Sequence, residues 1–348
     1  MSVPEHEAGL PPTVVVIPAL NEARGIGAVI DAFTGPGNDF IIDIIVADGG
    51  SIDGTQAVVA EAARRDARVR LLPNPKRLQS AGVNLATQEA DPRAEVILRA
   101  DSHAEYPADF AVRVVSALVT NDADSVVARM FSVGRGSFQR AVAAVSNSKA
   151  GSGGSRHRIG GQSGFVDHGH HAAFRRQLFR ELGGYDETFI ANEDAEFDAR
   201  IRAAGGRIWF EAGPEITYFP RATPAALARQ YWRYGYGRAR TFRKHGERLQ
   251  PRQMLPPVIL VAVLGGLLLA PLTPWALLIP GAYLLLGLAV GALLAWQLSD
   301  LAALAAPVAL AAMHLSWGAG FLRGLLSREK FTGPARPTLE FSATPRSE

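Results

Sequence analysis

The first two thirds of the chain alternate between short apolar runs and segments with helical periodicity. Four of the runs predict strands buried on both faces, because they hold few polar side chains. These runs cover residues 13–20, 41–48, 69–74 and 95–101. The intervening segments favour helix and cover residues 22–33, 54–65 and 79–90. Such alternation predicts an α/β fold with a mostly parallel sheet and helices on both faces.

The C-terminal third consists of three long apolar segments. They cover roughly residues 256–272, 275–296 and 301–322. A helix that spans a membrane needs about 20 apolar residues, which the second and third segments provide, whereas prolines interrupt the first. Asp300 is the only charged side chain from Gln253 to Leu322. We therefore expect a membrane domain over residues 246–326 with two to three transmembrane helices.

Lysine and arginine predict the orientation of this domain. The basic stretch 229–252 directly precedes the first apolar segment, which places it on the cytoplasmic side. The tail, residues 327–348, is also basic, which favours an even number of crossings, whereas three segments predict an odd number. Both alternatives stay open. Residues 1–11 contain acids and prolines without an apolar run, so we expect a flexible N-terminus without a signal peptide and a cytoplasmic first domain.

Composition excludes several classes of chemistry. The chain has no cysteine, which excludes disulfides, thiolate catalysis and cysteine metal sites. Its formal net charge of +3 does not by itself favour nucleic acid as a partner. Neither GxGxxG nor GxxxxGK[ST] occurs, so the sequence predicts no glycine-rich phosphate-binding loop.

Polar side chains follow three of the predicted strands. They are Asn21 and Glu22, then Asp48, Ser51 and Asp53, then Asp101, His103 and Glu105. Ligands of parallel sheets bind at this edge, although Ser51 and Asp53 suit a turn or helix cap equally well. Asp101 and His103 lie two residues apart in a loop and could bind one Mn²⁺ or Mg²⁺ ion. Such a cation would stabilise a departing diphosphate.

The stretch "ANEDAEFDARIRAAGG", residues 191–206, predicts a helix that Asn192 caps and Gly205–Gly206 end. Glu193 and Asp194 would lie in its first turn. Two interpretations stay open: the acids complement the helix dipole, or one of them is a general base.

For two further groups of polar residues, we expect no role in metal or diphosphate binding. The segment "DHGHHAAF", residues 167–174, has short spacing and no evident acidic partner, so we expect polar pocket or surface histidines rather than a metal site. Lys76, Arg77 and Arg99 could contact a diphosphate, but we expect each to be a solvated charge.

Several motifs resemble those of family-2 glycosyltransferases with the GT-A fold. In order, they are "VVVIPALNE", "IIVADGGSIDGT", "QSAGVNLA", "LRADSHAEYP", "RRQLFRELGGYDETFIANEDAEFDARIRAAGG" and "QYWRYGYG". The resemblance covers about residues 12–245 and implies a glycosyltransferase domain. The C-terminal segment with "HLSWGAGFLRG" resembles bacterial succinoglycan-biosynthesis glucosyltransferases.

The resemblance implies an inverting enzyme, multi-pass in the bacterial inner membrane, with its catalytic domain in the cytoplasm. The implied donor is a UDP-sugar, with UDP-glucose favoured, and the implied acceptor is a polyprenyl-diphosphate-linked saccharide. An exopolysaccharide assembly complex would be a further partner. Two alternatives stay open: a transferase that acts on polyprenyl monophosphate, and an inactive nucleotide-sugar-binding scaffold.

The resemblance also implies roles for individual residues. Asp194 would be the general base with Glu193 beside it, and Asp101 and His103 would stand at the metal motif. The implied nucleotide-sugar-binding residues are Ala19, Glu22, Asp48, Ser51, Asp53 and Asp101, with Asp48 on the uracil. The implied acceptor or diphosphate residues are Gln230, Arg233 and Tyr234, which resemble the QxxRW motif.

The sequence departs from the family pattern at three positions. His103 replaces the second acid of the usual Asp–x–Asp metal motif, and Gly49 follows Asp48 where a second acid is common. Tyr234 replaces the tryptophan of QxxRW. The last change favours the addition of a single sugar over processive polymerisation.

Overall fold

The computed structural model describes residues 9–246 and 249–334. Most of the predicted flexible N-terminus and of the predicted tail, residues 1–8 and 335–348, lies outside the described residues. The described chain divides into two compact units. The first unit comprises residues 9–130, 160–218 and 332–334, and the second comprises residues 131–159 and 219–331 without 247–248.

The first unit is built on one mixed sheet. Within the described residues its strand order is β3-β2-β1-β4-β8-β6-β9-β5, and β7 also pairs with β9. The strands are β1 (Thr13–Ala19), β2 (Ile41–Asp48), β3 (Val69–Pro73), β4 (Val96–Arg99), β5 (Ala104–Glu105), β6 (Ser125–Ser132), β7 (Gly164–Val166), β8 (His170–Arg175) and β9 (Ile208–Tyr218).

The first four strands of the chain form the parallel part of this sheet. β1 lies between β2 and β4 and is parallel to both, and β3 is parallel to β2. Every residue of β1 is buried, as expected for a strand covered on both faces. Antiparallel pairs extend the sheet from β4 through β8 and β6. The predicted α/β fold is confirmed.

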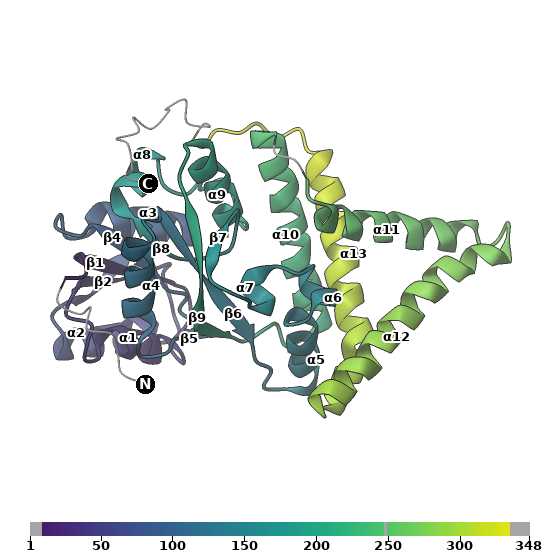
Figure 1. Ribbon diagram of the computed structural model, residues 1–348, viewed down its shortest axis with the longest axis horizontal. Helices are drawn as coiled ribbons and strands as arrows, with labels where there is room; N and C mark the ends of the chain where they lie inside the picture. Colours follow the sequence, from purple (N-terminus) through teal and green to yellow (C-terminus); the bar gives the residue numbers. More distant parts are fainter. Residues whose placement is uncertain (1–8, 247–248, 335–348) are drawn as a thin grey trace. The chain divides into compact units, whose positions relative to one another are not determined.

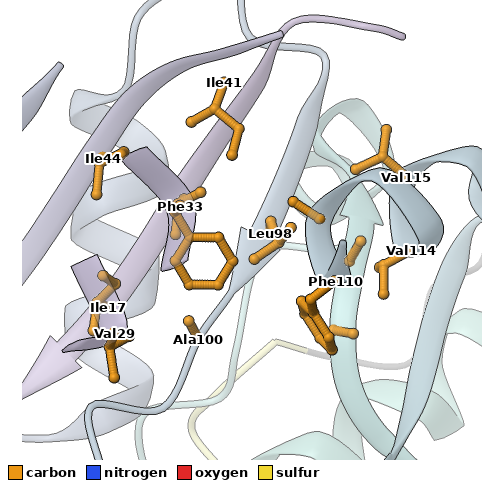
Figure 2. Packing of buried hydrophobic residues seen from close by; sticks show 14 of the residues in the cluster. Ile17, Val29, Phe33, Ile41, Ile44, Leu98, Ala100, Phe110, Val114 and Val115 are labelled. Carbon is orange, nitrogen blue, oxygen red and sulfur yellow. The ribbon is translucent and has the colours of Figure 1, made fainter. Parts of the chain in front are cut away.

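Helices cover both faces of the sheet. They are α1 (Ile26–Thr34), α2 (Thr55–Arg65), α3 (Gln79–Glu89), α4 (Phe110–Thr120), α8 (Arg176–Glu181) and α9 (Glu193–Ala203). On one face, Phe33 of α1 and Phe110 of α4 pack over Leu98 of β4 in an apolar core (Figure 2). On the other face, residues of α3, α8 and α9 form a second core around Phe174.

Helix α9 confirms one predicted boundary and corrects the other. It ends at Ala203, separated by one residue from the two glycines, and Gly205 has a φ of 77°. Asn192 precedes the helix with a φ of 64°, and its side chain makes no capping hydrogen bond. The predicted side-chain cap is wrong because a capping residue needs extended backbone. The Asn192 carbonyl instead accepts a hydrogen bond from the Glu196 amide.

The second unit is helical. Its helices are α5 (Ser137–Ser146), α6 (Lys149–Ser152), α7 (Arg156–Ile159), α10 (Pro224–His245), α11 (Pro251–Leu269), α12 (Leu278–Leu298) and α13 (Ala306–Leu325). Short 3₁₀ turns precede α12 and α13. By length and composition, three segments could span a membrane: Pro251–Leu269, Pro274–Leu298 and Leu301–Leu325. They coincide with the three predicted apolar segments.

Candidate functional site

Asp48 ends β2 and holds the turn that follows it. Its carboxylate accepts hydrogen bonds from the amides of Gly50 and Ser51, each at 3.1 Å, and from the Gln56 side chain at 2.7 Å. The Ser51 hydroxyl donates to the other oxygen. Burial raises the pKa of Asp48, but these hydrogen bonds outweigh burial and leave the pKa below its usual value.

The loops after β1 and β2 are joined by further hydrogen bonds. The Asn21 amide donates to Ser51 Oγ at 2.8 Å, and the Ala23 amide donates to Asp53 Oδ2 at 3.0 Å. Ala19, the last residue of β1, is buried beside them. Ser51 and Asp53 therefore act within the turn, and the structure brings the predicted nucleotide-binding residues of these two loops together.

Glu22 and His103 connect the loops after β1 and β4. His103 Nδ1 lies 3.5 Å from Glu22 Oε1, and both side chains are partly exposed. The three predicted loops, after β1, β2 and β4, therefore lie at the same edge of the sheet.

Asp101 is buried at the end of β4 and has polar partners on both oxygens. Gln79 of α3 donates to Oδ1 at 3.1 Å, and His170 Nε2 lies 3.4 Å from Oδ2. Burial raises the pKa of Asp101, but the charges of Arg99, His170 and His103 outweigh burial and lower the pKa to about 2. Asp101 is therefore ionised at neutral pH.

Arg99 is the centre of a buried cluster, which corrects the prediction of a solvated charge. Only 5% of its surface is exposed, because it is the last residue of a strand covered on both faces. Its Nη2 atom lies 3.5 Å from Asp101 Oδ1 and 3.4 Å from Glu193 Oε1. One guanidinium thus links the end of β4 to the first residue of α9. Lys76, by contrast, is exposed, as predicted, and pairs with Glu187.

A chain of buried hydrogen bonds runs from Arg99 to Asp198. Arg99 Nη1 donates to the Tyr185 hydroxyl at 3.1 Å. That hydroxyl lies 2.7 Å from His171 Nδ1, and His171 Nε2 lies 2.8 Å from Asp198 Oδ1. Because the hydroxyl already accepts from Arg99, its own proton is available for Nδ1. The chain therefore favours the tautomer of His171 with its proton on Nε2.

Asp198 is the acidic partner that sequence reasoning missed in the histidine segment. Its second oxygen lies 2.7 Å from His168 Nδ1, so it joins two of the three histidines. His171 is fully buried, whereas His168 and His170 are partly buried. The signal that could have found Asp198 is its spacing, since it follows Asp194 by four residues on the same face of α9. The expectation of polar pocket histidines agrees with these positions.

Glu193 and Asp194 experience different electrostatic environments although they are neighbours. Burial raises the pKa of Glu193, and the nearby Asp194 charge adds to that effect against the opposing charge of Arg99. Burial also acts on Asp194, but His168, His171 and Arg99 outweigh it and hold the pKa of Asp194 below its usual value. Asp194 is therefore the acid of the pair that ionises more readily, as a proton acceptor must.

Asn84 of α3 fixes the position of Tyr185. It donates to the Tyr185 carbonyl at 2.9 Å and accepts from the Tyr185 amide at 2.8 Å. Gly184 precedes Tyr185 with a φ of 67°, and any Cβ there would collide with the Asn84 side chain. The motif "QSAGVNLA" thus supplies Gln79 to Asp101 and Asn84 to Tyr185.

The sequence predicts that Asp101 and His103 are the ligands of a cation. Within residues 9–246 and 249–334, no group of three or more histidine, aspartate or glutamate side chains could hold a metal ion. One carboxylate and one imidazole nevertheless fit a divalent cation whose other ligands are phosphate oxygens, which is how Mg²⁺ commonly binds at nucleotide sites.

The predicted acceptor residues lie on α10 in the second unit. The Gln230 side chain donates to the Tyr234 hydroxyl at 2.8 Å, one helical turn away. Arg233 is exposed on the same helix. The tyrosine that replaces the motif's tryptophan thus contacts the glutamine of the same motif.

Comparisons with known proteins agree with this architecture. A family model described as "Glycosyl transferase family 2" matches residues 14–183, and one described as "Glycosyl transferase family group 2" matches residues 100–321. The succinoglycan biosynthesis protein ExoA of Rhizobium meliloti (strain 1021) is 42% identical over 315 residues, which are 90% of this chain and 95% of that protein.

Two more distant proteins share parts of this pattern. Glucosyl-3-phosphoglycerate synthase of Mycolicibacterium paratuberculosis (strain ATCC BAA-968 / K-10) is 34% identical over 110 residues, 31% of this chain and 33% of that protein. Among solved structures, the mannosyltransferase PcManGT from Pyrobaculum calidifontis, in complex with GDP-Man and Mn²⁺, has a TM-score of 0.56 and 21% identity. It covers 93% of this chain and 89% of its own, and it confirms the GT-A fold. On the family models and the long match to ExoA, the chain belongs to glycosyltransferase family 2.

Proposed function

We propose that this glycosyltransferase is an inverting enzyme that transfers one sugar, with glucose as the first candidate, from a UDP-sugar to a polyprenyl-diphosphate-linked saccharide. The match to a succinoglycan biosynthesis protein over nearly the whole chain supports a role in exopolysaccharide synthesis. The likeness in fold to a GDP-Man complex supports a nucleotide-sugar donor. The apolar helices support attachment to the bacterial inner membrane, with the catalytic unit in the cytoplasm.

One observation carries the proposal. A single buried guanidinium, Arg99, lies between Asp101 at the end of β4 and Glu193 at the start of α9. Asp194 follows directly in the first turn of that helix. Residues that would face the donor diphosphate and the acceptor hydroxyl are therefore held in one rigid cluster, which a displacement between two bound substrates requires.

The chemistry is a single in-line displacement. The acceptor oxygen forms a bond to the anomeric carbon of the sugar while the bond from that carbon to the diphosphate breaks. Asp194 accepts the proton of the acceptor hydroxyl, because its lowered pKa leaves the carboxylate ionised at neutral pH. Glu193 remains bound to Arg99 and orients the pair. The configuration at the anomeric carbon inverts.

Asp101 and His103 would hold the divalent cation. When bound, the cation would supply positive charge that stabilises the departing nucleoside diphosphate. Arg99 keeps the Asp101 carboxylate in place, and Gln79 donates a hydrogen bond to the same carboxylate.

The loops after β1 and β2 are the proposed nucleotide-binding edge. Asp48, Ser51 and Asp53 shape this edge through their hydrogen bonds, and Ala19 and Glu22 lie beside it. On α10, Gln230, Arg233 and Tyr234 are the proposed contacts for the acceptor or its diphosphate.

Transfer of radiolabel from UDP-glucose into membrane lipid tests the proposal. Membranes that contain the protein and a polyprenyl-linked acceptor are assayed with and without Mn²⁺, for the wild type and for Asp194→Asn. The amide cannot accept the proton, so we expect the rate of transfer to fall by about 10²- to 10⁴-fold, the usual contribution of a general base. Asp109→Asn, which changes an exposed aspartate of an ion pair with Arg113, should keep wild-type activity.

The outcomes separate the alternatives. Product with the mass of a single sugar on polyprenyl monophosphate would point to the other acceptor. Donor binding without transfer from any of a panel of nucleotide sugars would support an inactive scaffold. An Asp194→Asn variant with wild-type rate would show that another group takes the proton.

A further inference from the structure

The third apolar segment differs from the other two in what covers it. In α13, 33% of the apolar window is buried within the described protein, against 17% in α11 and 11% in α12. Exposed large apolar side chains run along the whole of α11 and α12. In the segment Leu301–Leu325, all of which the structure describes, they stop at Val308. A helix that faces lipid needs such a surface along its whole length.

Internal packing accounts for the hydropathy of α13. Its residues Ala306, Leu310 and Met313 form an apolar core with Val142 of α5 and Leu227 of α10. This core belongs to the second unit itself. Burial against helices of the protein therefore accounts for a larger part of the apolar composition of α13 than of α11 or α12.

Helix α10 runs beside α13 and in the same direction. A Cβ at Gly320 would collide with the backbone of Trp232, and a Cβ at Gly324 would collide with the backbone of Tyr236. Four residues further along α13, the contact has moved four residues further along α10, so the two helices are parallel. Figure 1 shows the two helices side by side. If α13 crossed a membrane, α10 would have to cross with it.

The charge of α10 forbids such a crossing. The helix carries six lysine and arginine residues and no acidic one: Arg229, Arg233, Arg238, Arg240, Arg243 and Lys244. Charged side chains at the centre of a bilayer are strongly disfavoured. Both ends of α10 therefore lie on the side of the membrane that holds the catalytic unit.

The two ends of α13 are tied to that same side. Before its start, Asp300 lies 3.2 Å from Arg140 of α5. Helix α5 has ten residues, about 15 Å, and cannot cross a hydrocarbon core of about 30 Å. At the other end, Arg243 of α10 donates to the Gly324 carbonyl at 3.3 Å. Arg323 lies in the last turn of α13, and Arg328 and Lys330 follow the helix, as expected for a cytoplasmic flank.

The hairpin of α11 and α12 meets α13 at separate points. A Cβ at Gly318 would lie 2.7 Å from the Pro256 carbonyl near the start of α11, and one at Gly287 of α12 would lie 3.4 Å from Pro307 at the start of α13. From these two places the helices converge on the turn at residues 270–274 (Figure 1).

We propose that α11 and α12 form a two-helix hairpin that crosses the bilayer and returns, while α13 lies with α10 on the cytoplasmic side at the membrane surface. The partner of the exposed apolar faces of α11 and α12 is the hydrocarbon core of the membrane. The number of crossings is two, so the chain after α13 is cytoplasmic. The inference rests on the proposed membrane attachment and not on the identity of the donor or acceptor.

Single cysteines test this topology, because the chain has none of its own. Thr273→Cys, Ser299→Cys and Lys330→Cys place one thiol each at exposed positions after α11, after α12 and after α13. Spheroplasts are treated with a membrane-impermeant maleimide before and after permeabilisation. Two crossings predict that Thr273→Cys is labelled in intact spheroplasts, whereas the other two are labelled only after permeabilisation.

Two results would overturn the proposal. Labelling of Lys330→Cys in intact spheroplasts would show that α13 crosses the membrane. Protection of Thr273→Cys until permeabilisation would show that the hairpin does not cross. Sugar transfer by each variant is assayed in parallel as a test of folding. Recovery of the wild-type protein in the soluble fraction would instead refute the membrane attachment, so the two failures are distinguishable.

Discussion

At the scale of single residues, the site depends on polar groups that are buried and bonded to one another. Arg99, Tyr185, His171 and Asp198 form a chain in which each link determines the next. The guanidinium can only donate, so the phenol accepts from it and offers its proton to His171. Asp198, between two imidazoles, keeps a pKa well below its usual value even though burial opposes this. The chain holds Arg99 in the orientation that links Asp101 to Glu193.

Tyr185→Phe removes the middle of this chain. Arg99 Nη1 and His171 Nδ1 would both lose a partner in a buried place, which costs about 1–3 kcal/mol for each unsatisfied group. We expect a lower free energy of unfolding and a slower transfer rate, since Arg99 is no longer fixed. Urea denaturation and the radiolabel assay measure the two effects. Tyr236→Phe, which loses only one long hydrogen bond of 3.4 Å to Ser327, is the control. Equal stability of the two variants would contradict the role of Tyr185.

Glu193→Gln probes the cost of burying a carboxylate beside Asp194. The pKa of Glu193 is higher in the folded than in the unfolded protein, so folding favours its protonated form. The ionised carboxylate therefore lowers the free energy of unfolding. This loss of stability is absent below the pKa that Glu193 has in the unfolded protein, and it is complete once the pH exceeds its pKa in the folded protein. Glutamine resembles the protonated form. We therefore expect the variant to be more stable than the wild type at pH 7 and equally stable at pH 4.

Urea denaturation at both pH values measures this difference. Glu61→Gln, at an exposed ion pair with Arg64, should change stability little at either pH. A variant that is less stable than the wild type at pH 7 would mean that the Arg99–Glu193 pair outweighs the cost of burial.

At the scale of elements, the sequence predicts whatever depends on local pattern. The first four strands are apolar runs, and α9 ends at its two glycines, because pleat and helix periods are properties of neighbouring residues. The partners of the buried polar groups depend on tertiary contacts instead. His171 and Asp198 lie on β8 and α9, 27 residues apart, and only the sheet brings them together. The burial of Arg99 could not be predicted from the sequence for the same reason. The four residues of β4 do not indicate which elements cover the end of the strand.

The packing of α10 on α13 depends on glycines at the contact. A Cβ at Gly235 would collide with the Trp317 carbonyl oxygen. Gly235→Ala should force the helices apart and cost about 1–3 kcal/mol, the usual penalty of overpacking. Thermal unfolding in detergent checks this expectation. Gly265→Ala, in α11 where a Cβ meets nothing within 4 Å, is the matched control and should be neutral or slightly stabilising. A neutral Gly235→Ala would show that the two helices are not in close contact.

At the scale of the whole molecule, the chain divides its apolar residues between two uses. The sheet cores and part of α13 bury theirs within the protein, whereas α11 and α12 leave most of theirs exposed. Hydropathy alone favours the second and third segments as membrane spans, because it measures composition and not what covers a helix. The contradiction between three segments and a basic tail is resolved if one of the segments is internal.

A shortened chain provides an independent test of which apolar helices are embedded in the membrane. In this variant a flexible glycine–serine linker of about 12 residues replaces residues 251–299 and joins α10 to the segment before α13. The fully extended linker spans about 40 Å. If only α11 and α12 are embedded, alkaline carbonate should extract the shortened chain from membranes but leave the full chain in the pellet. Flotation on a sucrose gradient distinguishes membrane-bound from aggregated protein. If α13 crossed the bilayer, one span would remain and the shortened chain would resist carbonate. Because α13 keeps its contacts with α5 and α10 in this variant, its behaviour reports directly on whether those contacts or lipid account for its apolar surface.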